Sequence, residues 1–248
     1  MINILLPAMG KSTFFKDYYF PKLMLEIGGE TMLEKIIKNF ESIDDHHFIF
    51  VFNQKECTEF HIDKSAQIIT EPDSSFITLK NETGGALCTC LLAISYINSD
   101  EPLIIANSDQ IIDVDYSDVA AYFEEHDLDA GVITFPSIHP RWSYVRMEGD
   151  NVIEVAEKRP LSKNAIAGFY YFKHGSDFIE AAKKVILKEN SINGKYYISS
   201  SLNELVLMNK KIGCYEIEKE QYHSFYSPEK IREYEKMKNK NSRPKKLD

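Results

Sequence analysis

The sequence has no apolar run that approaches the ~20 residues of a membrane-spanning helix. It also lacks an N-terminal segment with a basic start and a long apolar stretch, so we expect no signal peptide. Its 4 cysteines form neither a Cys-x-x-Cys pair nor the framework of a disulfide-rich domain. These absences predict a cytoplasmic protein with reduced thiols and no membrane partner.

An excess of basic residues is missing as well. The formal net charge is -9, from 38 acidic and 29 basic residues. Proteins that bind nucleic acid in general have a basic surface, so this charge argues against nucleic acid as a partner. One basic pocket on an acidic protein can still bind a nucleotide. The sequence also offers no persuasive Ser-His-Asp set and no cluster of zinc ligands.

What is present is the composition and pattern of an α/β protein. The 248 residues are 44% hydrophobic, enough for one substantial domain. Strand-like runs such as 48–52 and 103–106 alternate with helical segments, which favours a doubly wound, mostly parallel sheet. We also expect a strand over 66–70, a loop over 71–83 and a buried helix over 86–94.

The second half of the chain has a different pattern. Short strands over 144–147 and 152–156 are joined by the turn signal Glu148-Gly149-Asp150-Asn151, which predicts a small antiparallel strand pair. We find no internal repeat and no linker, so residues 1–238 are expected to form a single domain. Residues 239–248 are rich in Lys, Asn and Pro and are expected to form a flexible basic tail.

A short apolar strand and a glycine-bearing loop open the chain. Ile2–Leu6 is rich in strand formers, as is typical of a strand covered on both faces. Pro7 ends the ladder because it has no N–H, and Gly10 permits a tight turn or a close approach to a ligand. Gly10-Lys11-Ser12 matches the end of a P-loop, but that motif requires a glycine where Leu5 stands, so a P-loop is excluded.

The motifs that follow this strand resemble the opening of the sugar-phosphate nucleotidyltransferases. Pro7-Ala8-Met9-Gly10 is similar to the family's loop, and Pro21-Lys22 to its Pro-Lys pair. Thr31-Met32-Leu33-Glu34 then has the spacing of a capping box before a helix. Where the family usually has a second glycine and an arginine, this chain has Ser12 and Phe14. The resemblance implies a Rossmann-like fold of the GT-A type and a loop that binds the nucleotide at Leu6, Ala8, Met9 and Gly10.

Two further positions take nucleotide-binding roles from the resemblance. Lys22 would contact the phosphates, although a lysine alone would suit a surface position over an apolar strand. Gly84-Gly85 would let the base approach the backbone at the start of a helix, whose dipole favours anions. A simple helix entry is the alternative for this glycine pair.

Asn107-Ser108-Asp109-Gln110 directly follows the buried strand 103–106. Open α/β sheets bind their ligands at the carboxyl ends of strands. The family has a metal-binding aspartate at the position of Asp109, and Mg²⁺ prefers a few carboxylates together with substrate phosphates. We therefore predict that Asp109 binds Mg²⁺ and that Asn107 lies beside the nucleotide. An aspartate that caps the next helix is the alternative.

Glu157-Lys158 and the strand after it resemble the family's acceptor-binding segment, in which the lysine neutralises the acceptor phosphate. The resemblance extends to Gly168 on that strand and to Tyr197 and Asn203. An ordinary charged turn and tyrosines that pack in the core are the alternatives.

The segment His223–Glu229 is similar to an altered copy of the family's Asp-x-Gly-Thr-Pro-Glu-Asp ending. Ser224 stands where many members have an aspartate that binds a second metal ion. His223 or Glu218 is then the candidate for a second metal ligand.

Together these motifs predict a nucleotidyltransferase. A phosphate oxygen of the acceptor would attack the α-phosphorus of a nucleoside triphosphate and expel pyrophosphate. Since this nucleophile is already anionic, catalysis would consist of positioning and charge neutralisation by Mg²⁺, Lys22, Asp109 and Lys158.

Within the family, the altered motifs look most like those of the capsule-biosynthesis branch. That branch implies CTP as the triphosphate and L-glutamine phosphate as the acceptor. A conventional sugar-1-phosphate nucleotidyltransferase and a non-catalytic nucleotide-binding regulator are the alternatives. The sequence leaves the base, the acceptor and the oligomeric state open, a homo-oligomer included.

Overall fold

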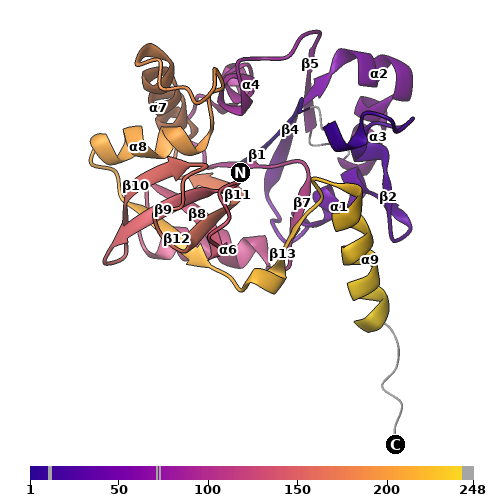
Figure 1. Ribbon diagram of the computed structural model, residues 1–248. Helices are drawn as coiled ribbons and strands as arrows, with labels where there is room; N and C mark the ends of the chain where they lie inside the picture. Colours follow the sequence, from indigo (N-terminus) through magenta and orange to yellow (C-terminus); the bar gives the residue numbers. More distant parts are fainter. Residues whose placement is uncertain (11–12, 71, 73, 242–248) are drawn as a thin grey trace, which may run out of the picture.

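The computed structural model describes the chain except for residues 11–12, 71, 73 and 242–248. Within this part, nine strands form one sheet, in which β8 and β12 adjoin the path β10-β9-β11-β6-β1-β4-β5 (Figure 1). Their bounds are β1 Ile2–Ala8, β4 His46–Asn53, β5 Ser74–Leu79, β6 Leu103–Ala106, β8 Ala130–Pro136, β9 Ser143–Glu148, β10 Asn151–Glu157, β11 Asn164–Phe172 and β12 Ile212–Glu216.

The central strands of the sheet are parallel. β1 pairs in parallel with β4 and β6, β4 with β5, and β8 with β12. β11 runs antiparallel to β6, β8 and β9, and β9 and β10 form the predicted hairpin. Two small antiparallel pairs lie apart from the sheet: β2 (Glu26–Ile27) with β3 (Glu30–Thr31), and β7 (Gln110–Ile112) with β13 (Tyr222–Ser224). The predicted α/β fold with a mostly parallel central sheet is confirmed.

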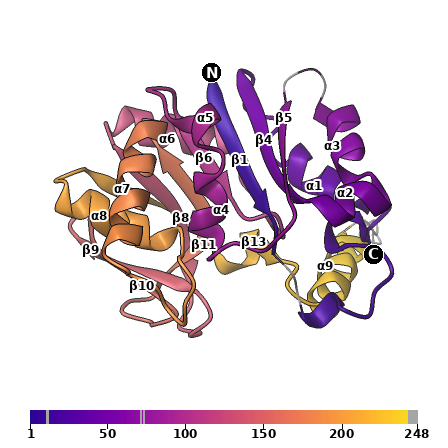
Figure 2. The same ribbon diagram turned by 90° about the horizontal axis from the view of Figure 1, so that it is seen from above.

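Helices cover both faces of the sheet because successive residues of each buried strand point to opposite sides. Ile4 and Leu6 of β1 pack in one core cluster and Leu5 in the other. In Figure 2, α1 (Met32–Lys38) and α3 (Ile62–Thr70) lie on one side of β1 and β4, and α4 (Ala86–Leu91) and α5 (Ile94–Ile97) on the other. The remaining helices are α2 (Gln54–Phe60), α6 (Tyr116–Glu125), α7 (Gly175–Leu187), α8 (Ser199–Leu207) and α9 (Pro228–Asn241).

Helix α1 begins at the predicted capping box. The Thr31 hydroxyl accepts a hydrogen bond from the Glu34 backbone N–H, and the Glu34 carboxylate accepts one from the Thr31 backbone N–H. These bonds satisfy two backbone donors that the first turn would otherwise leave unpaired. The apolar residues that follow this capping box are buried: Met32, Leu33, Ile36, Ile37 and Phe40.

Two predictions next to β4 are wrong. Residues 66–70 are not a strand but the second half of α3, whose buried Ile62, Ala66 and Thr70 recur every four residues. A run of five residues is too short to distinguish the helical period of 3.6 residues from the strand period of 2. The expected loop over 71–83 contains β5, an edge strand without a fully buried residue. An edge strand does not need the continuous apolar run by which buried strands are recognised.

The helix expected over 86–94 is divided into α4 and α5, and it is buried along one face instead of all round, since Leu92 is half exposed. At the other end of the chain, α9 continues through Asn241, so residues 239–241 belong to a helix. The rest of the predicted tail, 242–248, lies outside the described residues. No helix in the described part is long and apolar enough to cross a membrane.

Candidate active site

Three adjoining cavities surround the loop after β1, and Gly10 lines all of them. The first contains Lys22 and Asp109, the second extends toward Gly85 and Tyr197, and the third toward Arg141. They lie at the carboxyl ends of β1 and β6, which is where open α/β sheets bind ligands. The second has a volume of about 450 Å³, within the range of small-molecule sites.

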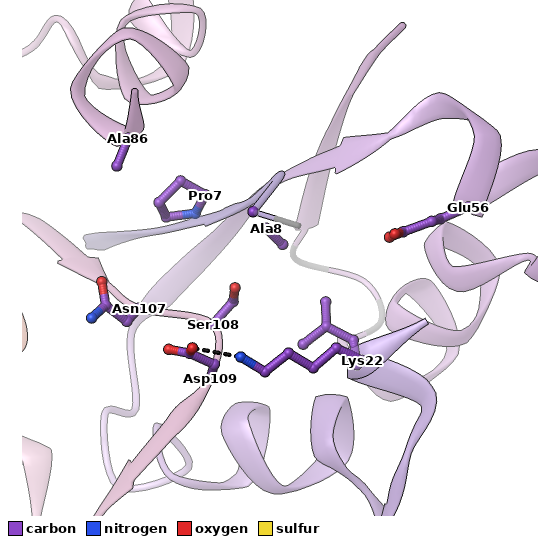
Figure 3. Close-up of a pocket in the computed structure, with 10 residues that line it drawn as sticks. Pro7, Ala8, Lys22, Glu56, Ala86, Asn107, Ser108 and Asp109 are labelled. Carbon is purple, nitrogen blue, oxygen red and sulfur yellow. Dashed lines mark hydrogen bonds and ion pairs between the residues drawn. The ribbon is translucent and has the colours of Figure 1, made fainter. Parts of the chain in front are cut away.

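Lys22 and Asp109 form the centre of the site. The Lys22 Nζ lies 2.6 Å from the Asp109 Oδ2 (Figure 3), and their side chains are 15% and 33% exposed. Lys22 opens a 3₁₀ turn directly after the extended Pro21, and Asp109 lies between β6 and β7. The Asp109 carbonyl accepts a hydrogen bond from the Phe225 backbone N–H at 2.8 Å. Two residues 87 positions apart, both predicted from sequence, are therefore in direct contact.

Gly168 holds the loop that carries Asp109. Its carbonyl accepts hydrogen bonds from the Asn107 backbone N–H at 2.9 Å and from the Gln110 Nε2 at 3.0 Å. Its φ is +63°, and an added Cβ would lie 2.1 Å from the Asn107 Nδ2. The pairing of β11 with β8 shifts between Ile166 and Tyr170, around this glycine. Gly168 thus positions the loop, and its predicted contact with an acceptor stays a prediction.

A partly buried tyrosine also supports this loop. Tyr222 of β13 donates its hydroxyl to the Gln110 Oε1 at 3.2 Å. Burial, with a smaller contribution from the Asp109 charge, raises the pKa of Tyr222 above its usual range. The hydroxyl is therefore a neutral donor at all physiological pH values.

The predicted nucleotide-binding residues lie in two groups. Met9, Gly10 and Gly85 line the second cavity, and Ala8, Gly10 and Asn107 line the first. Leu6, in contrast, packs in the core and lines none of the three cavities. Phe14 lines the third cavity, whereas Ser12 and Lys11 lie outside the described residues.

Gly84-Gly85 is in close contact with the backbone of Tyr196. The Tyr196 N–H donates to the Gly84 carbonyl at 2.8 Å, and the Leu87 N–H donates to the Tyr196 carbonyl at 3.2 Å. Gly85 has φ +135°, and an added Cβ would lie 2.3 Å from the Tyr196 oxygen. The glycine pair therefore joins the entry of α4 to the loop before α8, and the close approach of Tyr196 is a structural reason for a glycine at position 85.

The predicted acceptor residues Glu157, Lys158 and Tyr197 lie together at the end of β10. The Lys158 Nζ donates to the Tyr197 hydroxyl at 2.6 Å, and Tyr197 lines the second cavity. The Glu157 carboxylate accepts hydrogen bonds from the hydroxyls of Ser143 and Ser199. The predicted acceptor segment thus adjoins the cavity that Met9 and Gly10 of the predicted nucleotide-binding loop line.

Asn203 lies on α8, and its side-chain amide forms two hydrogen bonds with the backbone of one residue of β10. Its Oδ1 accepts from the Val155 N–H, and its Nδ2 donates to the Val155 carbonyl, each at 2.8 Å. The amide therefore satisfies the backbone N–H and carbonyl of Val155, which a neighbouring strand would otherwise pair, at the edge of the sheet. Acceptor binding by Asn203 stays a prediction.

The candidates for a second metal ligand do not lie with Asp109. The Tyr222 hydroxyl bonds to Gln110, the residue after Asp109. His223 is the next residue of β13 and faces the opposite side, because adjacent residues of a strand face opposite sides. The His223 Nε2 instead lies 2.9 Å from the Asp113 Oδ2. Glu218 lines a separate cavity beside Thr134.

The described residues contain no group of three or more His, Cys, Asp or Glu side chains that could hold a metal ion. Asp109 is therefore the candidate ligand, and its Oδ1 makes no hydrogen bond or ion pair with any described residue. One carboxylate with a free oxygen fits Mg²⁺ in a site where substrate phosphates and water supply the other ligands.

Sequence reasoning missed Arg141. This residue lies between β8 and β9, and its guanidinium carbon is 3.4 Å from the centroid of the Tyr226 ring. It lines the third cavity together with Lys22 and Asp109. No spacing in the sequence links Arg141 to Asp109. The two residues share a cavity only because the fold places the segment before β9 next to the segment after β13, where Arg141 stacks on Tyr226.

Comparison with known proteins identifies related chains. The sequence matches the family described as Nucleotidyl transferase over residues 18–217. A search of the curated proteins gives no match.

Several solved structures share the fold. A nucleoside-diphosphate-sugar pyrophosphorylase from Vibrio cholerae RC9 is 23% identical, with a TM-score of 0.79 over 95% of this chain and 100% of its own. A UDP-glucose pyrophosphorylase complexed with UDP-glucose is 18% identical, with a TM-score of 0.79 over 97% of this chain and 100% of its own. HddC from Yersinia pseudotuberculosis is 17% identical, with a TM-score of 0.66 over 95% of this chain and 98% of its own. This similarity extends over the whole sheet and its helices.

Proposed function

The chain belongs to the nucleotidyl transferase family, and we propose that it transfers a nucleoside monophosphate from CTP to L-glutamine phosphate with release of pyrophosphate. The observation that supports a transfer reaction is the position of the Lys22–Asp109 pair. The pair lines the first cavity, which shares Pro7, Gly10 and Ala86 with the second. The second cavity is lined by Tyr197, to which Lys158 donates a hydrogen bond. CTP and L-glutamine phosphate come from the resemblance to the capsule-biosynthesis branch. The 4 free cysteines suit the reducing cytoplasm, where such substrates occur.

The chemistry requires little beyond positioning and charge. An acceptor phosphate oxygen forms a bond to the α-phosphorus, and the bond from that phosphorus to the bridging oxygen breaks. Lys22 neutralises the triphosphate, Lys158 neutralises the acceptor phosphate, and Asp109 would hold Mg²⁺. When bound there, Mg²⁺ would supply positive charge to the phosphate oxygens. The nucleophile is anionic, so no residue has to remove a proton from it.

We expect the two lysines to affect different substrates. Lys22→Ala should raise the Michaelis constant for the triphosphate, and Lys158→Ala should raise that for the acceptor. The reason is that Lys22 lines the first cavity, whereas Lys158 bonds to Tyr197 of the second. Losing one charge-assisted contact typically costs ~10- to 100-fold in binding. Steady-state kinetics with each substrate varied in turn measures the two Michaelis constants. If Lys22→Ala and Lys158→Ala raised both constants equally, the assignment of each lysine to a different substrate would be contradicted.

A sugar-1-phosphate nucleotidyltransferase is the second candidate. The similar solved structures include pyrophosphorylases of nucleotide sugars, one of them with UDP-glucose bound. Such an enzyme would use the same Lys22–Asp109 centre with a different acceptor. A nucleotide-binding regulator without activity is the third reading, because Ser12, Phe14 and Ser224 depart from the family's motifs.

Pyrophosphate release with four triphosphates, each tested against L-glutamine phosphate and several sugar 1-phosphates, separates these three functions. We expect CTP to exceed UTP in kcat/KM. A backbone carbonyl near Met9 or Gly85 can accept from the cytosine amino group, whereas it repels the uracil O4. An unpaired buried polar group costs ~1–3 kcal/mol, which gives roughly 5- to 150-fold discrimination. Equal or reversed values would favour the sugar-nucleotide reaction, and no release at all would favour the regulator.

A further inference from the structure

Arg141 differs from the other arginines of the described chain. Arg146 and Arg159 both pair with Glu154, and Arg232 pairs with Glu229. Arg141 is partly buried, and no described carboxylate forms an ion pair with it. A guanidinium keeps its charge at any physiological pH and offers five N–H donors in a plane. This one therefore has donors that the described protein does not use.

Aromatic rings fix the plane of this guanidinium. Its carbon lies 3.4 Å from the centroid of the Tyr226 ring and 5.3 Å from that of Trp142. The ring of Phe14 meets the edge of Tyr226, with 6.0 Å between centroids. Stacking orients an arginine while its N–H groups, which lie in the plane, stay free to bind. The side chain is thus held in place before any ligand binds, which lowers the entropy cost of binding.

The free donors belong to the third cavity, which has a volume of about 320 Å³. Its wall contains Lys22, Asp109 and Arg141, together with Gly10 and Thr13, which follow β1 in the chain. Two cations that share one cavity with backbone of a glycine-bearing loop suit a ligand with several anionic oxygens. Arginine binds such oxygens in pairs, in the way that it binds phosphate and carboxylate groups.

The position of the cavity indicates which phosphate it takes. Attacking and leaving oxygens lie roughly in line on opposite sides of the phosphorus. The acceptor lysine, Lys158, bonds to Tyr197 of the second cavity, and neither residue lines the third. The first cavity adjoins both, because it shares Pro7 and Ala86 with the second and Lys22 and Asp109 with the third. A nucleophile that arrives from the second cavity would then expel its leaving group toward the third.

We propose that Arg141 binds the β- and γ-phosphates of the triphosphate and then the departing pyrophosphate, an inference that rests on the proposed function. When the bond between the α-phosphorus and the bridging oxygen breaks, its electron pair stays on that oxygen. The charge of the pyrophosphate then increases beside Arg141 and Lys22. Arg141 is in this reading a catalytic residue, because it stabilises negative charge that grows during the reaction.

The test combines direct binding with kinetics in the full-length chain. Calorimetry with magnesium pyrophosphate measures binding without turnover, and kcat/KM for CTP measures its consequence. We expect Arg141→Ala to weaken pyrophosphate binding by about 10- to 100-fold. Its kcat/KM should fall by ~10²–10³, with the Michaelis constant of the acceptor unchanged. Arg141→Lys keeps the charge without the planar fork and should lose most of the binding too.

Arg146→Ala is the matched control, because Arg146 is exposed on the neighbouring β9 and pairs with Glu154. It should behave like the unmodified protein. Pyrophosphate binding by folded Arg141→Ala within twofold of normal, in a chain that transfers nucleotide, would overturn the assignment and leave the proposed function standing. If binding depends on Arg141 but no triphosphate is turned over with any acceptor, the assignment of Arg141 as a pyrophosphate ligand stands and the proposed function fails.

Discussion

Replacement of Asp109 by alanine is expected to lower kcat by ~10²–10³, the usual effect of removing one electrostatic element from a transition state. Asp109 contacts Lys22 at 2.6 Å and lines two of the three cavities. The fold should persist, because the carboxylate is one-third exposed and no packed apolar group is lost. Pyrophosphate release over a Mg²⁺ titration measures the change, and circular dichroism checks the fold.

Asp113→Ala serves as a control for this prediction. Asp113 lies four residues further along the chain, but it pairs with His223 and Lys238 and lines none of the three cavities. We expect this variant to keep most of the activity. Turnover close to normal in folded Asp109→Ala would show that the metal ligand and the reacting centre lie elsewhere.

Gly168→Ala is expected to impair both stability and activity. The added Cβ would lie 2.1 Å from the Asn107 Nδ2 and 2.5 Å from the Gln110 Oε1, at a φ of +63°. Left-handed strain and overpacking together cost about 2–5 kcal/mol. Relief of the clash would displace the loop that carries Asp109. Denaturant unfolding gives the stability, and kcat/KM for the triphosphate gives the effect on the site.

Gly149 provides a matched comparison. It has a similar φ of +57°, in the turn between β9 and β10, but nothing lies within 4 Å of an added Cβ. Gly149→Ala should therefore show the backbone strain alone, about 1–2 kcal/mol, with normal activity. If Gly168→Ala matched Gly149→Ala in both measurements, close packing against Gly168 would not be what holds the loop.

Local patterns were enough to predict the elements nearest the reacting centre. The apolar run of β1, the capping box at Thr31 and the aspartate at the end of β6 depend on residues within a few positions of one another. Since parallel strands end at the same edge of a sheet, the pairing of β1 with β6 brings the loop after β1 close to Asp109. The resemblance to a family added the prediction that Glu157 and Lys158 bind the acceptor.

The features that sequence reasoning missed depend on distant contacts. β5 is an edge strand that becomes recognisable only through its pairing with β4. The β7–β13 pair joins residues more than a hundred positions apart. Arg141 reaches the site through its stacking on Tyr226, which no local pattern encodes. Asn203 was matched to an acceptor-binding segment, and only the fold shows that its amide is bonded to Val155.

The loop that carries Asp109 has a consequence for the order in which the protein matures. Gln110 is held by Gly168 and Tyr222, residues 58 and 112 positions later in the chain, and Phe225 binds the Asp109 carbonyl. A ribosome-bound chain that has emerged only as far as β7 already contains Lys22 and Asp109 but not these supports. Contacts between distant segments form late in folding. The nascent protein therefore exposes the loop after β1 well before the Lys22–Asp109 pair has its supports, which are complete only once β13 and Phe225 have been synthesised.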